Sequence, residues 1–228
     1  MSEPDNKKQR TLRPRDAATL ILYRQAGRQV EVLMGERHGG HAFMPNRYVF
    51  PGGRVDPTDH KVRSATALKP LVAANLAKAC GVARARALAN AAIRETFEET
   101  GLLIGAPDPN PGMPVPKAWE PFFASGLAPT HDVLDYVVRA ITPPFRPRRF
   151  NARFFIADAR YIQGSIKGSG ELLDLRWIAV EDALKLELPG ITEIVLQQIN
   201  ALIARPQSGP HGVTLYRMRY GKRLVVQE

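Results

Sequence analysis

Three glutamates, Glu95, Glu98 and Glu99, lie three and four residues apart in a stretch without proline or glycine. Residues at these spacings share one face of a helix, so their carboxylates would project together. Each like-charged pair costs about a few tenths of a kcal/mol on an isolated helix, and partial burial raises that cost, so a bound cation is the natural compensation. Mg²⁺ is the expected ion, with Mn²⁺ as the alternative, because Mg²⁺ takes hard oxygen ligands and is typically shared with substrate phosphates.

The helix that carries these glutamates must hold them rigidly. We expect it at residues 83–100, with Gly101 as the residue that ends it in a left-handed conformation. Arg94 precedes Glu98 by four residues and can orient that carboxylate or Glu95 by a charge-assisted hydrogen bond. The other side of the helix should pack into a sheet; it carries Ala92, Ile93, Thr96 and Phe97.

Two glutamates in succession would by themselves indicate only a solvated helix face. Here they stand in a longer string that resembles the box of the Nudix hydrolase family, usually written G-x5-E-x7-R-E-U-x-E-E-x-G-U, where U is aliphatic. The resemblance is carried by Arg94, Glu95, Glu98, Glu99, Gly101 and Leu102, with Phe50-Pro51-Gly52-Gly53 upstream. Thr96 departs mildly at the first U. Gly53 matches the opening glycine, Asp59 stands in place of the first glutamate, and the seven-residue spacer has grown to the 34 residues 60–93.

The long spacer resembles one Nudix branch in particular, which includes the mammalian peroxisomal coenzyme A diphosphatase and many bacterial relatives. Pro143-Pro144, residues 148–155 and residues 171–177 resemble that branch too, so the likeness covers most of residues 17–200. The resemblance implies an α/β (α+β) fold, a Nudix-type α/β/α sandwich with a mixed central sheet. A helical insert, residues 60–82, would lie between the glycine turn and the glutamate helix.

The resemblance also implies a reaction at phosphorus. A water activated by a metal ion or by a carboxylate would attack one phosphorus of a diphosphate, and a nucleoside or similar monophosphate would leave. Glu98 and Glu99 would be the principal metal ligands, with Glu95 as a further ligand or as the base that takes the proton of the water. A backbone carbonyl of Gly52 or Gly53 could supply one more oxygen ligand, since glycine permits close approach. The expected catalytic set is Glu95, Glu98 and Arg94.

Substrate contacts are expected from four further residues. Arg148 and Arg149 can pair with a phosphate in bidentate fashion, although a solvated basic turn explains them equally well. Glu171, later in the chain, is a candidate for the carboxylate that acts as the base; the alternative is that it is an ordinary turn residue. Arg37 ends the segment Val32-Leu33-Met34-Gly35-Glu36-Arg37, which stands where other coenzyme A Nudix hydrolases carry Leu-Leu-x-x-Arg-Ser.

The expected function is hydrolysis of a diphosphate linkage in a nucleoside diphosphate derivative, with coenzyme A or an acyl-coenzyme A as the preferred substrate. A likeness of fold does not determine what a pocket accepts, so other nucleotide derivatives follow closely. The alternative is a non-catalytic Nudix domain that senses a nucleotide or binds RNA. The formal charge of +10 favours anionic partners in general, but the chain retains all three helix glutamates, which argues for a small nucleotide-type substrate over nucleic acid.

The remaining composition indicates one domain. Residues 1–16 form a basic arm without apolar periodicity and are expected to be flexible, whereas residues 17–228 should form a single domain. Cys80 is the only cysteine, so no internal disulfide can form, which fits a reducing compartment. No apolar run approaches the roughly 18 residues of a membrane helix. We therefore expect a soluble, cytoplasmic protein without a membrane partner, in which the insert could support a homodimer.

Apolar and alternating runs predict the elements around the site. A hairpin is expected from residues 17–23 and 29–34, a short strand at 47–50 that leads into the glycine pair, and a helix at 68–79. The proline-rich residues 105–118 should form a loop. Further strands are expected at 133–140, 153–159 and 174–180, a helix at 191–204, and a last hairpin at 215–218 and 224–226.

Overall fold

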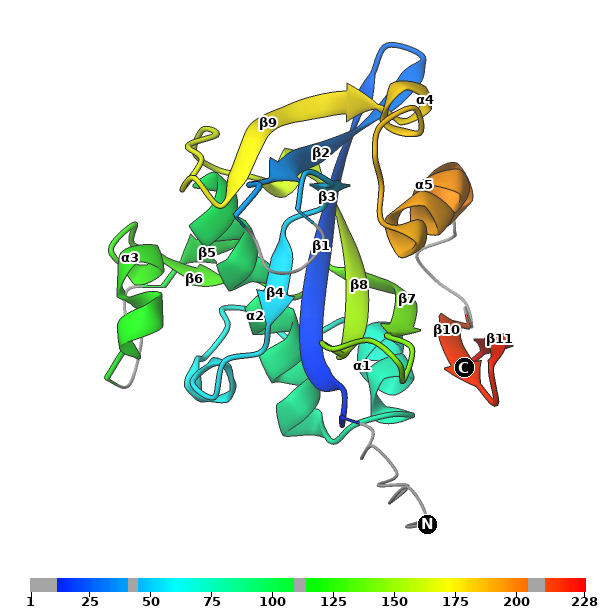
Figure 1. Ribbon diagram of the computed structural model, residues 1–228. Coiled ribbons are helices and arrows are strands. Elements are labelled where there is room, and N and C mark those ends of the chain that lie inside the picture. Colours follow the sequence, from blue (N-terminus) through cyan, green and yellow to red (C-terminus); the bar gives the residue numbers. More distant parts are fainter. Residues whose placement is uncertain (1–11, 41–44, 109–113, 205–211) are drawn as a thin grey trace, which may run out of the picture.

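The computed structural model of the chain describes residues 12–40, 45–108, 114–204 and 212–228 (Figure 1). Its main sheet contains β1 (Arg15–Ala26), β2 (Gln29–Arg37), β3 (Tyr48–Val49), β4 (Gly52–Arg54), β7 (Asp135–Ile141), β8 (Phe150–Asp158), β9 (Leu172–Ala179), β10 (Thr214–Arg219) and β11 (Lys222–Gln227). The strand order is β11-β10-β7-β8-β1-β2-β3, with β4 paired to β1 and β9 paired to β2. β1 is parallel to β8 and β10 is parallel to β7, while the other pairs are antiparallel, so the sheet is mixed as predicted.

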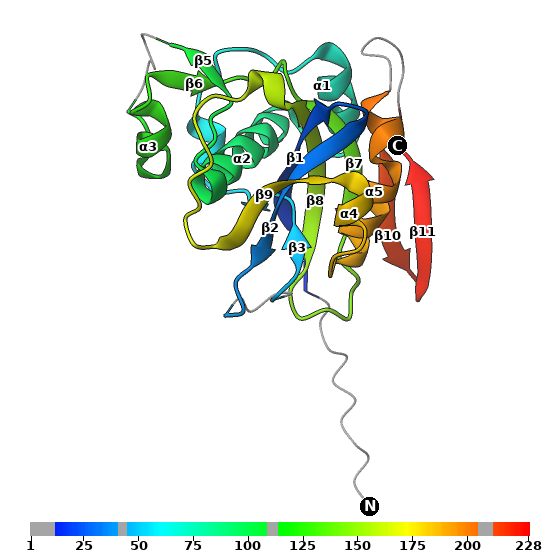
Figure 2. The ribbon, with the colours of Figure 1, turned by 90° about the horizontal axis from the view of Figure 1, so that it is seen from above.

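Helices cover both faces of this sheet. The longer ones are α1 (Pro70–Ala77), α2 (Val82–Thr100) and α5 (Gly190–Ile203), and short turns of helix are α3 (Glu120–Phe123) and α4 (Val180–Ala183). Leu20 and Leu22 of β1 pack in the core beneath α1 and α2, whereas Ile21 packs in the core beneath α5. Successive strand side chains point to opposite faces, so the two cores lie on opposite sides of the sheet. Figure 2 shows α2 on one side of the sheet and α5 on the other. The predicted α/β/α layering is confirmed.

The glutamate helix is the longest helix described. Its inner side is lined by alanines and larger apolar residues such as Leu88 and Ile93, which are fully buried against the sheet. Gly101 has a φ of 74°, and its N–H donates to the carbonyl of Phe97 at 2.8 Å, which ends the helix in a left-handed cap. The helix predicted at residues 83–100 therefore ends where α2 ends and begins one residue later than α2 does.

Both predicted hairpins are present, β1 with β2 and β10 with β11. The insert is helical, but its helix is shorter than residues 68–79 because Pro70, which has no N–H to donate, occupies the first helical position. Within the described residues, no helix combines the length and the apolar character that crossing a membrane requires.

Two predictions were wrong in part. Residues 105–118 are not all loop, because β5 (Gly105–Pro107) pairs with β6 (Leu127–Pro129) in a separate two-stranded sheet. A Cβ at Gly105 would lie 2.7 Å from the carbonyl of Ala128, so glycine is what permits this pairing. The basic arm does not extend to residue 16, because β1 already begins at Arg15, which pairs with Phe150 of β8. Residues 1–11 of the arm lie outside the described residues.

Candidate active site

The last turns of α2 face β4 and carry the three glutamates. Glu99 is 7% exposed, the side chain of Glu95 is 15% exposed and that of Glu98 is 42% exposed. The three glutamates therefore lie on one face of α2, as predicted, but they differ in burial. The helix presents two nearly buried carboxylates and one that is largely open to water.

The glycine pair explains how two carboxylates approach β4 so closely. The N–H of Gly52 donates to Oε2 of Glu99 at 2.9 Å. A Cβ at Gly53 would lie 2.6 Å from Oε1 of Glu95, and a Cβ at Gly52 would lie 2.6 Å from the carbonyl of Ala18 on β1. Side chains at these positions would displace either a carboxylate or the neighbouring strand, so the sequence motif has a direct steric reason.

Gly53→Ala should therefore separate activity from stability. The added methyl group meets the flexible end of Glu95, which can swing away, so we expect the free energy of unfolding to change by less than about 1 kcal/mol. The displaced carboxylate should reduce kcat about 100-fold. Urea unfolding and steady-state hydrolysis measure the two effects. Gly190→Ala, where a Cβ has open space, is the control; a Gly53→Ala protein with wild-type kcat would contradict the placement of Glu95.

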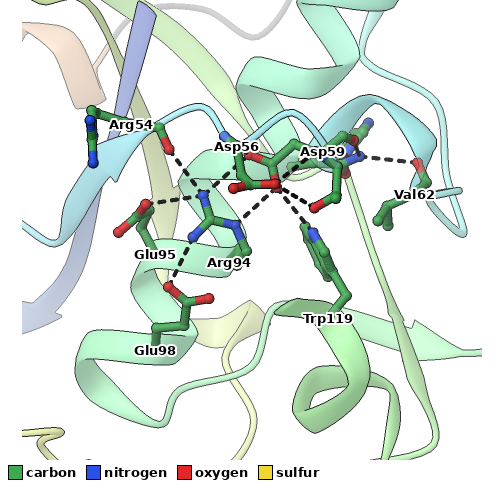
Figure 3. Close-up of polar contacts among 11 residues, drawn as sticks. Arg54, Asp56, Asp59, Val62, Arg94, Glu95, Glu98 and Trp119 are labelled. Carbon is green, nitrogen blue, oxygen red and sulfur yellow. Dashed lines mark hydrogen bonds and ion pairs between the residues drawn. The ribbon is translucent and has the colours of Figure 1, made fainter. Parts of the chain in front are cut away.

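Arg94 holds two of the glutamates (Figure 3). Its Nη1 donates to Oε2 of Glu98 at 2.9 Å, and its Nη2 lies 3.0 Å from Oε1 of Glu95 and donates to the carbonyl of Arg54 at 3.0 Å. Burial opposes the charge of this arginine, but the hydrogen bond with Asp59 and the neighbouring carboxylates raise its pKa. Both predicted partners of Arg94 are therefore present at once, and the guanidinium fixes their positions relative to β4.

Asp59 anchors Arg94 from the opposite side. It is fully buried, and its Oδ1 accepts from Nε of Arg94 at 2.9 Å and from Nε1 of Trp119 at 3.0 Å. Its Oδ2 accepts from the backbone N–H of Asp56 at 2.7 Å, as the dashed lines of Figure 3 help to follow. Asp59, which replaces the first glutamate of the box, therefore supports α2 through Arg94. Sequence reasoning missed Trp119, since nothing in the chain marks a contact across sixty residues.

Trp119→Phe should destabilise the protein by about 2 to 3 kcal/mol, because it leaves a buried charged acceptor with one donor fewer and a cavity where the larger ring was. The matched control is Trp177→Phe, since Trp177 is only partly buried and stacks beneath Arg24 at 4.7 Å. Trp177→Phe should lower the free energy of unfolding by about 1 kcal/mol or less. Urea unfolding measures both variants. Equal decreases in the free energy of unfolding would show that the hydrogen bond from the indole N–H of Trp119 adds no particular stability.

A second buried group ties the insert to α2. Nε2 of His131 lies 2.6 Å from Oδ1 of Asn90, whose Nδ2 donates to the carbonyls of Asp59 and Val62 at 2.8 and 3.1 Å. The amide of Asn90 is therefore the acceptor toward His131, and Nε2 carries the proton. Nδ1 of His131 has no hydrogen-bond partner among the described residues, and burial lowers the pKa of this histidine to about 4.

This histidine predicts a loss of stability in acid. Between about pH 6.5 and pH 4 the unfolded chain binds a proton on His131 that the folded protein does not, so stability falls as the pH falls through this window. The loss at pH 5 relative to pH 7 is about 2 kcal/mol. The His131→Gln variant, whose amide can still donate to Asn90, should not show this loss of stability between pH 7 and pH 5. The raised pKa values of Glu95 and Glu99 act in the opposite direction, so the informative quantity is the difference between the two proteins in urea unfolding at both pH values. Identical pH dependence would contradict the buried neutral histidine.

Burial makes the charged form of these carboxylates unfavourable. Burial raises the pKa of Glu99 to about 8 and that of Glu95 to about 7, and it also raises the pKa of Glu98. Arg37 at the end of β2 and Glu171 just before β9 lie close enough to influence Glu99 electrostatically, and burial lowers the pKa of Arg37. The structure thus brings two predicted substrate residues to the glutamate cluster.

The chemistry of this cluster fits a divalent cation. Glu95 and Glu99 offer the hard oxygen donors that Mg²⁺ and Mn²⁺ take, and a cation would relieve the cost of burying their charges. Among the described residues no three acidic, histidine or cysteine side chains converge as a ready ligand set. The contacts of these carboxylates use one oxygen each: Oε1 of Glu95 and Oε2 of Glu98 lie against Arg94, and Oε2 of Glu99 accepts from the N–H of Gly52. The second oxygen of each carboxylate could therefore take a cation.

The cluster opens into a broad cleft of about 1710 Å³. Glu95 and Glu99 line it together with three of the predicted substrate residues, Arg37, Arg148 and Glu171. Arg149 is not among the lining residues; its Nε donates to the carbonyl of Thr142 at 3.1 Å and its Nη1 donates to the carbonyl of Leu12. Arg149 thus holds neighbouring backbone, whereas Arg148 remains a candidate for contact with a substrate phosphate.

Comparison with known proteins yields two informative similarities. The crystal structure of a Nudix hydrolase from Alicyclobacillus acidocaldarius matches with a TM-score of 0.66 and 29% identity, over 85% of this chain and 93% of that one. A Caenorhabditis elegans protein named "Putative nudix hydrolase 7" is 32% identical over 155 residues, which are 62% of this chain and 43% of the relative. The chain therefore spans less than half the length of that relative. No family model matches the chain.

Proposed function

Because these similarities support placing the chain in the Nudix hydrolase superfamily, we propose that it is a pyrophosphohydrolase that cleaves a diphosphate linkage in a nucleotide-type substrate with the help of Mg²⁺ or Mn²⁺. The observation that carries the proposal is the burial of Glu95 and Glu99 against the glycine pair. Buried carboxylates without a full set of cationic partners are costly, and such groups cluster at functional sites.

The proposed roles follow from where each side chain lies. Glu98 and Glu99 would hold the cation, with a backbone carbonyl of Gly52 or Gly53 as a further donor, and Glu95 would be either a further ligand or the base. When bound, a divalent cation lowers the pKa of water and neutralises charge on phosphate oxygens. Arg94 sets the position of Glu95 and Glu98 and remains fixed by Asp59.

The reaction transfers one phosphoryl group to water. A bond forms between the water oxygen and one phosphorus, the bond from that phosphorus to the bridging oxygen breaks, and the bridging oxygen leaves on a monophosphate. The proton of the water must pass to a base. Glu95, whose pKa burial raises to about 7, is suited to this near neutral pH, and Glu171 at the rim of the cleft is the second candidate.

Within this class, coenzyme A or an acyl-coenzyme A is the proposed preferred substrate. The proposal rests on the long insert between glycine turn and glutamate helix, which resembles the branch that acts on coenzyme A, and on Arg37 and Arg148, which line the cleft. Comparison of kcat/KM for coenzyme A, ADP-ribose, NADH and nucleotide sugars tests it. Coenzyme A should give the highest value; a higher value for another member would remove the substrate proposal and leave the reaction class intact.

A further inference from the structure

The strand β11 forms one edge of the main sheet. It has β10 on one side, and among the described residues no strand pairs with its other side (Figure 2). Its register with β10 is regular from the pair Arg219–Lys222 to the pair Thr214–Gln227, and it contains no proline. Proteins usually protect such an edge with proline, a bulge, a very short strand or charges, because its open N–H and C=O groups can join another sheet. β11 carries charge only at its start, so most of its edge is unprotected.

The hydrogen bonds of the hairpin determine which residues of β11 point outward. The N–H of Glu228 donates to the carbonyl of Val213 at 2.9 Å, and the N–H of Val213 donates to the carbonyl of Glu228 at 3.4 Å. In an antiparallel pair such bonded residues alternate with residues whose backbone groups point away from the partner strand. The N–H and C=O groups of Arg223, Val225 and Gln227 therefore point out of the sheet edge.

The charges of this edge follow a polar order along the strand. Lys222 and Arg223 begin β11, and Glu228 follows its end. Oε1 of Glu228 pairs with Nη1 of Arg139 at 2.7 Å, whereas Oε2 has no hydrogen-bond partner among the described residues. Val225 at the centre is uncharged and 53% exposed. A basic end, an apolar centre and an acidic end complement the same strand running in the opposite direction.

We infer that β11 pairs with β11 of a second copy of this chain, antiparallel and about a two-fold axis at Val225. In this register the two Val225 residues exchange both hydrogen bonds, and Arg223 of each copy exchanges both with Gln227 of the other, so every outward-facing residue of the strand is paired. Lys222 then lies opposite Glu228 of the other copy, and opposite charges so placed are stabilising. The two main sheets become one continuous sheet, with each contact made twice.

Other ways of covering the edge fit less well. Parallel pairing would bring Lys222 and Arg223 of both copies side by side, and like charges across a strand pair are destabilising. Shifting the antiparallel register by two residues in either direction leaves Arg223 or Gln227 without a partner on the other β11. An extended acidic peptide would meet the basic end favourably but would be repelled by Glu228. The second copy is the occupant that satisfies both ends.

The pairing would also bring the second copy to the rim of the cleft. Arg223 pairs with Met218 across the hairpin, and both residues line the cleft. Gln227 of the second copy would lie about 5.5 Å from Arg223 between Cα atoms, on the same face of the sheet. The inference does not depend on the proposed hydrolysis, because it follows from the edge of the sheet alone.

Sedimentation equilibrium of the full chain tests the inference. The wild type should have twice the 25.2 kDa of one chain at micromolar concentration. Val225→Pro should raise the dissociation constant at least about tenfold, because proline lacks the outward N–H that the second copy needs. The hairpin itself should remain, since β10 does not use that N–H, and circular dichroism checks this. Val225→Thr keeps both the N–H and the branched shape and is the matched control. Wild-type protein that remains a monomer at about 100 μM would overturn the inference.

A disulfide cross-link tests the register without relying on proline. Val225→Cys places the cysteines of the two copies about 5.5 Å apart between Cα atoms, which a disulfide can span. Leu224→Cys is the control, since its diagonal separation of about 8 Å is too long. Oxidation should link only the Val225→Cys protein, and equal linking of both variants would overturn the register.

A third variant separates this interface from one at the helical insert. Val82, which ends the insert at the start of α2, is 74% exposed. Val82→Ser should leave the dimer intact. A dimer that Val82→Ser dissociates and Val225→Pro does not would overturn the inference in favour of the insert. A wild-type monomer that binds poly-glutamate, with binding lost in Val225→Pro, would overturn it in favour of an acidic peptide.

Discussion

Glu99→Gln should reduce kcat for diphosphate hydrolysis about 1000-fold and leave the metal-free protein at least as stable as the wild type. Glu99 is 7% exposed, and burial raises its pKa to about 8, so its negative charge is unfavourable in the folded protein. Glutamine keeps an oxygen that can accept from the N–H of Gly52 but lacks the charge needed to hold a cation. Glu98→Gln should lower kcat by at least about 100-fold for the same reason.

The readout that separates a catalytic role from a structural one is the melting temperature with and without Mg²⁺. A ligand that binds only the folded state raises the melting temperature, so Mg²⁺ should stabilise the wild type and not the Glu99→Gln protein. Glu181→Gln, at the exposed start of α4, is the matched control and should behave as the wild type in both assays. Wild-type kcat in the Glu99→Gln protein would remove this glutamate from the proposed site.

Asp59→Asn should destabilise the protein by about 3 kcal/mol or more, because it removes the one fully buried carboxylate of the three that pair with the buried guanidinium of Arg94. Asp59 is fully buried and accepts hydrogen bonds from Arg94, Trp119 and the backbone of Asp56, so water cannot replace what is lost. Urea unfolding at neutral pH measures the loss. Asp182→Asn, an exposed pair with Lys185 on the surface, is the control and should change stability by about 0.5 kcal/mol or less.

A double-mutant cycle gives the specific prediction for this pair. Arg94→Met and Asp59→Asn together should cost at least about 1 kcal/mol less than the sum of the two single changes, because each single change strands the other partner. Strict additivity would show that the two side chains are not coupled. In that case Asp59 would not support α2 through Arg94.

The sequence predicts the glutamate helix well because its signals are local. Apolar residues recur on one face of α2, and Gly101 closes it, so its limits follow from periodicity and capping alone. The same reasoning places Glu95, Glu98 and Glu99 on one face. The four-residue spacing also predicts that Arg94 can orient Glu98 or Glu95, and the structure shows contacts with both. The helix period does not predict the unequal burial of the three carboxylates.

The parts of the site that the sequence does not reveal depend on distant contacts. Trp119 reaches Asp59 across sixty residues, and His131 reaches Asn90 across forty-one. Neither carries a spacing or motif that marks it. The pairing of β5 with β6 was missed because a proline-rich segment indicates a loop, whereas Gly105 lets the short strand approach its partner.

Product analysis with and without a divalent cation tests the proposed metal-dependent hydrolysis. The purified protein would be incubated with coenzyme A, ADP-ribose, NADH, nucleotide sugars and dinucleoside polyphosphates, each in Mg²⁺, in Mn²⁺ and in excess EDTA. We expect at least one substrate to yield a nucleoside or similar monophosphate with the metal ion, and no substrate to yield one with EDTA. The absence of cleavage across the whole panel, or cleavage that EDTA leaves unchanged, would contradict it.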